Sequence, residues 1–203
     1  MVAEDLARTG VEDVRVKTVG DTDSATESEN ITAFEGEIDA LISSVEYALY
    51  LDDAPGMGIA KRVNETAVET ETPLTVAQLL GLEAILGPTI VPGESPCLLC
   101  LLKRWQSFQD NLDSYRAYVE STTERQNIHL PAHERLLAGL VSKEATTQLL
   151  TGHGYVVGRT LDVDLLSMDL ETNEVLKMPR CDVCGVKHED WQRLIDFQAI
   201  KDD

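Results

Sequence analysis

The cysteines of this chain occur only as two Cys-x-x-Cys pairs, Cys97 with Cys100 and Cys181 with Cys184. The two-residue spacing lets both thiolates of a pair face one metal ion, and four thiolates complete the closed tetrahedral shell of a structural zinc site. A redox-active pair is the alternative, but a thioredoxin-like site needs a single pair next to a βαβ pattern. The sequence therefore predicts that all four cysteines bind one structural zinc ion.

The distance between the two pairs along the chain is unusual. An ordinary zinc ribbon has about 15–20 residues between its pairs, whereas residues 101–180 lie between these two. The metal is therefore expected to join two distant parts of a larger fold.

Length and composition indicate a globular and strongly acidic chain. Its 203 residues are 43% hydrophobic, which suffices for one domain with a substantial core. No apolar run could span a membrane and the N-terminus has no signal pattern, so a membrane is not expected as a partner. Metal-binding thiols indicate a reducing cytoplasm.

The charge balance bears on the partners of this chain. There are 36 Asp and Glu against 17 Lys and Arg, and the net charge of −19 repels phosphate backbones, so nucleic acid is not expected as a partner. The acidic residues lie in every segment. This spread favours a solvated acidic coat, as in halophilic proteins, over a docking face for a basic partner.

The apolar pattern before residue 95 predicts alternating strands and helices. We expect a short strand at 14–19, an acidic loop at 21–30, and a buried strand from Ile38 to Val45 that continues into a helix through Leu49 and Leu51. Residues 55–63 are expected to turn the chain, and 73–93 to form a strand pair punctuated by Gly87-Pro88 and Pro92-Gly93.

After Cys100 the apolar residues follow the three-and-four spacing of helices. A long amphipathic helix is expected from Leu101 to Val119, and a second with apolar positions from Leu136 to Leu150 is expected to end at Gly152. Residues 158–180 alternate in two runs around 171–173, which predicts a β-hairpin leading to Cys181. The tail is expected to form one short helix. The fold class is therefore α/β.

Four stretches together resemble the ThiF-like family, the ubiquitin-activating-enzyme-like adenylating proteins. They are DALISSV with GLEAILGPTIVPGESPCLLCL, then HERLLAGLVSKEATTQLLTG, and finally VLKMPRCDVCG. The resemblance covers residues 4–185 and is strongest to the ThiF-like partner proteins of YcaO cyclodehydratases, which make thiazole- and oxazole-modified peptides. It implies a truncated, partial Rossmann-like sheet at 1–95, a zinc-stapled helix pair and hairpin of the same domain at 96–185, and a C-terminal tail at 186–203.

The resemblance also identifies what this chain lacks. ThiF-like enzymes bind ATP at a glycine-rich turn after their first strand, because phosphates contact free backbone N–H groups there. This sequence has no such motif, so the resemblance implies a chain without the first βα unit. In active members an acid at the end of a strand holds the magnesium of ATP; Glu46 could serve there, or could be a plain acid in the first turn of a helix. Bound ATP and magnesium are therefore doubtful.

The expected function follows from these points. The resemblance implies a zinc-stabilised scaffold in bacteriocin-type peptide biosynthesis, inactive alone, with a YcaO-type cyclodehydratase or a precursor peptide as partner. The alternative is an ATP-dependent adenylating enzyme whose nucleotide loop is supplied upstream or by another chain. An unrelated zinc-bound binding domain is a third interpretation. Relatives pair as dimers, so a homodimer is also an expectation.

Overall fold

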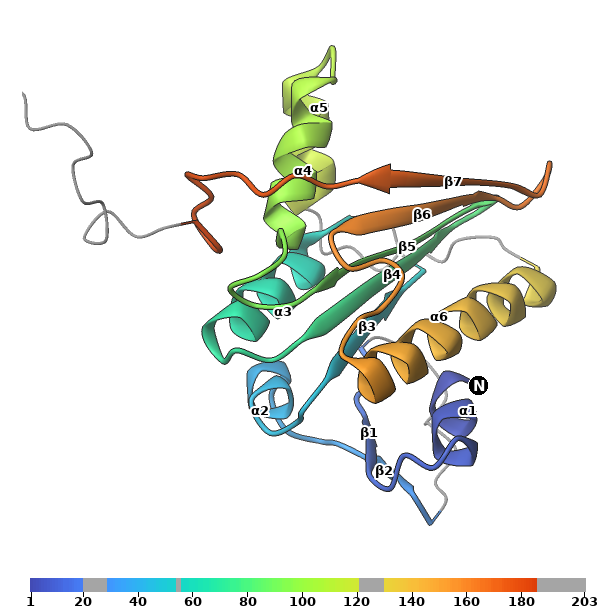
Figure 1. Cartoon of the computed structure of the whole chain (residues 1–203). Coiled ribbons are helices and arrows are strands. Elements are labelled where there is room, and N and C mark those ends of the chain that lie inside the picture. Colours follow the sequence, from blue (N-terminus) through green and yellow to red (C-terminus); the bar gives the residue numbers. More distant parts are fainter. Residues whose placement is uncertain (20–28, 54–55, 121–129, 186–203) are drawn as a thin grey trace, which may run out of the picture.

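A computed structural model of the chain describes residues 1–19, 29–53, 56–120 and 130–185. Its centre is a five-stranded mixed sheet in the order β3-β4-β5-β6-β7, with a separate parallel pair β1-β2 beside it (Figure 1). The strands are β1 (Val14–Val16), β2 (Ile31–Ala33), β3 (Ala48–Asp52), β4 (Leu74–Leu80), β5 (Glu83–Ile90), β6 (Arg159–Asp164) and β7 (Asp169–Glu174). Strands β3 and β4 run parallel, and the remaining neighbours in the large sheet are antiparallel.

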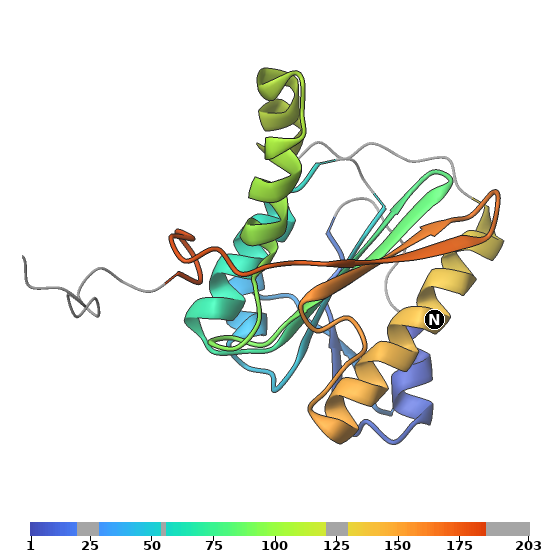
Figure 2. The same ribbon diagram turned by 45° about the horizontal axis from the view of Figure 1, so that its top comes forward.

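Helices cover both faces of this sheet. They are α1 (Val2–Arg8), α2 (Ile38–Ile42), α3 (Gly58–Glu69), α4 (Leu98–Ser107), α5 (Leu112–Glu120) and α6 (Pro131–Thr151). Helices α3 and α4 pack on one side, whereas α6 packs on the other with α1 against it (Figures 1 and 2). The result is an α/β layered fold, as the apolar pattern predicts.

Strand β4 is the centre of the core because its two faces contribute to different apolar clusters. Leu74 and Val76 pack with α3 and α4, whereas Ala77 and Leu79 pack with α6. A strand buried on both faces shows a nearly continuous apolar run, which is the pattern seen here. Burying each large side chain fully stabilises the fold by about 1.5–3 kcal/mol.

The loop after α6 is held by a buried carboxylate. Helix α6 ends at Gly152, which has the left-handed conformation expected of a helix stop. Glu144, only 1% exposed, then accepts hydrogen bonds from the backbone N–H groups of Tyr155 (2.8 Å) and Val156 (2.9 Å). Gly154 lies so close to this carboxylate that a β-carbon there would collide with it. Residues 152–158 (GHGYVVG) are therefore a structural loop that joins α6 to the sheet.

The prediction for residues 38–51 is wrong, because helix and strand are exchanged. Residues 38–42 form α2 and residues 48–52 form β3. A short apolar run cannot be assigned to strand or helix by periodicity alone. The tertiary structure favours the helix, since Asp39 in its first turn accepts hydrogen bonds from Arg62 (2.7 Å) and Thr66 (2.9 Å) of α3.

Three further predictions are corrected. Residues 58–63 do not turn the chain but begin α3, whose buried Ala60, Val63 and Ala67 follow helical spacing. The helix expected from 101 to 119 is two helices, α4 and α5, separated at residues 108–111. The hairpin turns at 165–168, and residues 171–173 lie within β7. The short helix expected in the tail lies outside the described residues.

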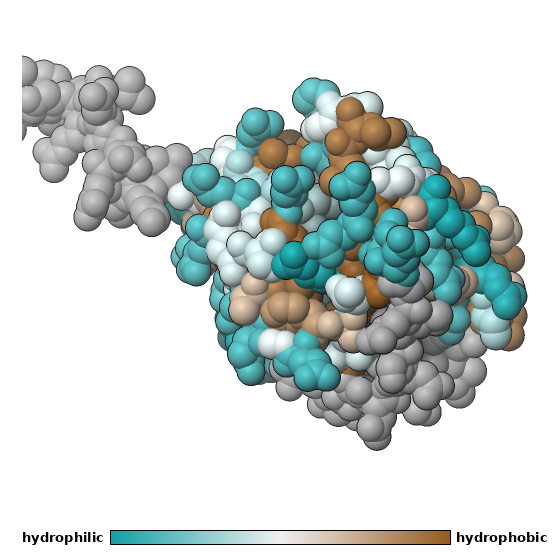
Figure 3. All heavy atoms as spheres, turned by 90° about the horizontal axis from the view of Figure 1, so that it is seen from below, coloured by the Kyte–Doolittle hydropathy of each residue, from teal (hydrophilic) through white to brown (hydrophobic). Residues whose placement is uncertain are grey.

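The described surface is largely polar. Figure 3 shows hydrophilic side chains across the visible face, with smaller apolar patches between them. None of the helices in the described ranges is both long and apolar enough to cross a membrane.

Candidate metal centre

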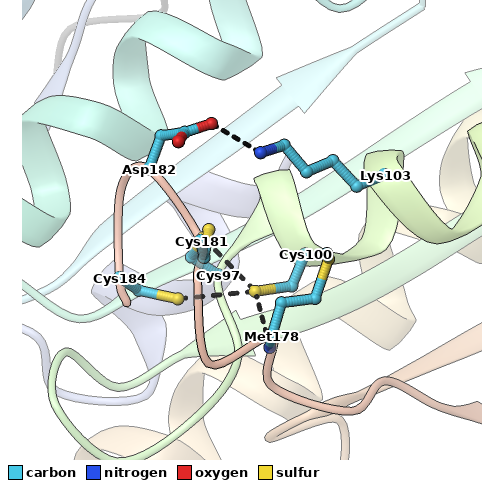
Figure 4. Close-up of polar contacts among 7 residues, drawn as sticks. All are labelled: Cys97, Cys100, Lys103, Met178, Cys181, Asp182 and Cys184. Carbon is cyan, nitrogen blue, oxygen red and sulfur yellow. Dashed lines mark hydrogen bonds and ion pairs between the residues drawn. The ribbon is translucent and has the colours of Figure 1, made fainter. Parts of the chain in front are cut away.

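The four predicted cysteine ligands meet at one point beside the large sheet. The Sγ atoms all lie within 4.8 Å of one another. Cys97 Sγ is 4.0 Å from Cys100 Sγ and 3.6 Å from Cys181 Sγ, and Cys100 Sγ is 3.4 Å from Cys184 Sγ (Figure 4). A disulfide needs sulfurs about 2.05 Å apart, and all four cysteines are free thiols.

These separations fit a tetrahedral metal ion. Zinc–sulfur bonds of about 2.3 Å in a tetrahedron place the sulfurs roughly 3.8 Å apart; the three separations above, 3.4–4.0 Å, bracket this value, and all of the separations are within 4.8 Å. Cys97, Cys100 and Cys181 are buried and Cys184 is half-buried. The cluster could therefore hold a metal ion in a closed shell, and four protein ligands would leave no position for a substrate.

The first pair is placed by the start of α4. Cys97 caps this helix with an extended backbone, and the Cys100 N–H donates to the Cys97 carbonyl over 3.0 Å. Leu98 N–H donates over 2.9 Å to the side-chain Oδ1 of Asn64, which is 1% exposed. Asn64 therefore fixes the turn that carries both sulfurs. Sequence patterning did not identify it, because an Asn on the buried face of an amphipathic helix has no distinctive motif.

The second pair lies in a tight turn after β7. Cys181 N–H donates to the Met178 carbonyl over 3.1 Å, and Gly185 N–H donates to the Cys181 carbonyl over 2.9 Å. A β-carbon at Gly185 would collide with the backbone of Cys181, so only glycine fits this turn. The turn thereby directs Cys181 and Cys184 to the same side.

Direct contacts hold this turn against α4. Met178 N–H donates to Cys100 Sγ over 3.4 Å, and Lys103 pairs with Asp182 at 2.5 Å (Figure 4). Arg104 donates to the Leu176 carbonyl over 3.2 Å. Asp182 is 77% exposed, so solvent screens this ion pair and it stabilises the fold only weakly. The contacts orient the two cysteine turns, whereas a bound metal would provide the strong link.

The thiols interact strongly with one another. The Cys97 thiol donates to Cys100 Sγ, and this hydrogen bond lowers the pKa of Cys100 to about 4 and raises the pKa of Cys97. Burial raises the pKa of Cys184 to about 11. The metal-free cluster therefore favours a thiolate at Cys100 and thiols at Cys97 and Cys184, so metal binding must release protons.

Glu46 lies in an exposed bend before β3 and not at the end of a strand. The strand that follows ends at Asp52, which accepts a hydrogen bond from Tyr50 over 2.7 Å. Asp52 therefore occupies the kind of position that the resemblance assigns to a magnesium-binding acid, because ligands bind outside the carboxyl ends of parallel strands. The shifted strand assignment explains why the sequence pattern pointed to Glu46, whose role remains a prediction.

One edge of the large sheet is open in the described part of the chain. Strand β3 pairs with β4 along one edge, and no described strand pairs with its other edge. The β1-β2 pair is a separate sheet, linked to the region before β3 by a hydrogen bond from Arg15 to Ser44 (3.2 Å). Parallel strands are usually interior strands, so the open edge of β3 is unusual.

Comparison with known proteins gives relatives by sequence and by structure, although no family model matches the chain. Protein HesA of Nostoc sp. (strain PCC 7120 / SAG 25.82 / UTEX 2576) is 28% identical over 174 residues, which cover 85% of this chain and 58% of HesA. Protein HesA of Leptolyngbya boryana is 27% identical over 157 residues, 77% of this chain and 50% of HesA. The chain thus spans about half the length of the curated relatives it matches.

Solved structures show the same fold. E. coli MccB with succinimide matches with a TM-score of 0.57 at 17% identity, over 77% of this chain and 45% of MccB. A heterocyclase in complex with substrate and cofactor matches with a TM-score of 0.58 at 18% identity, over 91% of this chain and 26% of the heterocyclase. This chain therefore has a mixed α/β fold similar to the Rossmann-like fold of MccB and other ThiF-like proteins, with four clustered cysteines on it.

Proposed function

We propose that this chain is a zinc-stabilised, ThiF-like scaffold or partner protein in peptide modification of the thiazole/oxazole type. The observation that carries the proposal is the closed four-cysteine centre on a sheet similar to those of MccB and a heterocyclase. Cys97, Cys100, Cys181 and Cys184 would hold the zinc ion, whose role is to join α4 to the turn after β7. The partner is a YcaO-type cyclodehydratase or its precursor peptide, in the cytoplasm.

The proposal assigns no catalytic residue to this chain. A closed thiolate shell gives zinc no open position for a substrate or an activated water. No glycine-rich phosphate loop opens a helix in the sequence. The zinc-loaded chain would therefore orient a peptide or an enzyme for a reaction carried out elsewhere.

The test is reconstitution from purified parts. The zinc-loaded chain, a YcaO-type cyclodehydratase and its precursor peptide are mixed with ATP, and water loss from the peptide is followed by mass spectrometry. We expect the chain to bind one of the two partners and to raise the rate of ring formation, whereas the Cys181→Ser variant should not. No binding to either partner, together with ATP–pyrophosphate exchange by the chain alone, would overturn the proposal.

The alternative is an adenylating enzyme whose nucleotide loop comes from an upstream segment or another chain. Two observations favour it: the open edge of β3, where a further strand could pair, and Asp52 at the carboxyl end of β3. The genomic sequence upstream of Met1 gives the first test, since this alternative needs a glycine-rich turn after an apolar strand there or in a partner gene. Adding that segment should then produce ATP–pyrophosphate exchange, and Asp52→Asn should abolish it.

A further inference from the structure

Helices α4 and α5 form an open groove lined by aromatic rings. The break at 108–111 folds α5 back along α4, and the two helices project from the rest of the fold (Figures 1 and 2). The groove has a volume of about 600 Å³, and Trp105, Phe108, Tyr115 and Tyr118 line it. Phe108 is 82% exposed, which is unusual for so large an apolar ring.

Two of the four rings are fixed by the protein itself. The Tyr115 hydroxyl donates to the Leu102 carbonyl over 2.6 Å, which joins α5 to α4. The pKa of Tyr118 is raised overall, mainly by burial and also by the nearby Asp52 carboxylate, while hydrogen bonds with the Gly56 backbone and the Gln78 side chain partly oppose this rise. Tyr118 thus reaches the carboxyl ends of β3 and β4, the edge at which open α/β sheets bind ligands. The groove has a rigid inner wall and an exposed outer ring.

The charges around the groove favour a cation. Asp110 lines it with the uncharged residues Gln109, Asn111 and Ser114, and no cationic side chain is among the described residues that line it. The cations nearby on α4 and α5 have partners of their own: Lys103 pairs with Asp182, Arg104 with the Leu176 carbonyl, and Arg116 with Asp113. Ring faces attract cations, and an aromatic lining beside a carboxylate suits a lysine or arginine side chain.

We propose that this groove binds an extended peptide segment through one lysine or arginine side chain, held between Phe108 and Trp105 and paired with Asp110. The net charge of −19 would attract such a segment, whereas an acidic segment would be repelled. The choice of a peptide as the ligand rests on the proposed function, because a partner in peptide modification must contact a peptide. The groove adds the surface and the chemistry of the segment.

The experiment uses the full zinc-loaded chain with Trp191→Phe, which leaves Trp105 as the sole tryptophan. The probe is a short N-acetylated, C-amidated peptide with a single arginine among serine, glutamine and leucine residues. A second peptide of the same sequence has citrulline, the neutral isostere of arginine, in place of the arginine. Emission of Trp105 reports binding. We expect saturable binding of the arginine peptide and binding about tenfold weaker for the citrulline peptide.

Variants separate the groove from the general acidic surface. Phe108→Ser should weaken binding about tenfold and Asp110→Asn about threefold. The matched controls are Leu150→Ser, which removes another exposed apolar side chain, and Glu171→Gln, which removes another exposed carboxylate on β7. Both should change binding less than twofold. Equal binding of the two peptides, equal losses in variants and controls, or unchanged Trp105 emission would each overturn the proposal.

The failure of this proposal can be told apart from the failure of the proposed function. If the chain supports ring formation but Phe108→Ser binds the arginine peptide like the parent chain, only the groove is wrong. If the groove binds the arginine peptide as expected but no cyclodehydratase or precursor is bound, the proposed function is wrong and the groove stands.

Discussion

Cys97 and Cys181 are 84 positions apart in the chain, and their Sγ atoms lie 3.6 Å apart. Between them the chain forms α4, α5, α6 and the β6-β7 hairpin. The cysteine cluster therefore closes a long loop of the fold, and breaking it frees both the start of α4 and the turn after β7.

Removing one ligand tests the metal centre. Elemental analysis should find about one zinc ion per parent chain and none in Cys181→Ser. The substitution should also lower the free energy of unfolding by about 3 kcal/mol, or roughly 10 °C in Tm, because structural zinc binding stabilises the folded state. His153→Ala, at an exposed position outside the cluster, is the control and should keep its zinc. Full stability in the metal-free parent chain would contradict a structural role.

The Asn64 side chain is expected to support the centre indirectly. Asn64→Leu leaves Leu98 N–H without its buried acceptor, so unfolding should become easier by about 1–3 kcal/mol and zinc should be released faster to a chelator. Asn173→Ala removes an exposed hydrogen bond to Asp162 and should change neither quantity by more than about 0.5 kcal/mol. Zinc release at the parent rate from Asn64→Leu would show that α4 needs no such support.

Two glycine substitutions in the same region should have opposite effects. Gly154→Ala places a methyl group against the Glu144 carboxylate, and unfolding by denaturant should show a loss of about 1–3 kcal/mol. Gly139→Ala in α6 meets no atom within 4 Å and should stabilise by about 0.5–1 kcal/mol, since alanine favours helix. Equal effects would mean that the Glu144 loop tolerates rearrangement.

Alkaline pH should destabilise the fold through buried tyrosines. Burial raises the pKa of Tyr115 to about 12 and also raises the pKa values of Tyr47 and Tyr50. The unfolded chain ionises these groups near pH 10 and the folded chain does so only at higher pH, so stability is complete below about pH 10 and falls above it. Urea unfolding of the zinc-loaded chain, followed from about pH 8 to about pH 11, measures how the free energy of unfolding changes with pH. Tyr47→Phe should flatten this dependence, and an unchanged slope would count against Tyr47.

Salt should stabilise this chain. With a net charge of −19, repulsion among carboxylates opposes the compact state, and raising KCl shortens the Debye length from about 10 Å at 0.1 M to about 3 Å at 1 M. Tm should rise by roughly 5 °C over this range. Sorbitol at the same osmolality is the control, because it is excluded from the protein surface but does not screen charges. A Tm that falls with KCl would argue against an acidic coat adapted to salt.

Several features could be predicted from the sequence because they depend on neighbours along the chain. The spacing within each cysteine pair predicts two turns whose thiols face a common point, and the four sulfurs do lie close enough that they could hold one metal ion. The apolar run at 73–93 predicts the β4-β5 pair, and Gly152 predicts the end of α6, since strand alternation and left-handed glycine are local properties.

Other features depend on contacts that only the tertiary structure creates. Residues 38–42 form a helix that buries Ile42 in the core and brings Asp39 to Arg62 and Thr66 of α3, and nothing near Asp39 in the sequence indicates these partners. Asn64 supports the metal centre because α3 packs beside the start of α4. The sequence by itself determined that four thiols were available in two turns. The packing of α4 against the turn after β7 decided that they meet, because residues so far apart come together only when the sheet between them has formed.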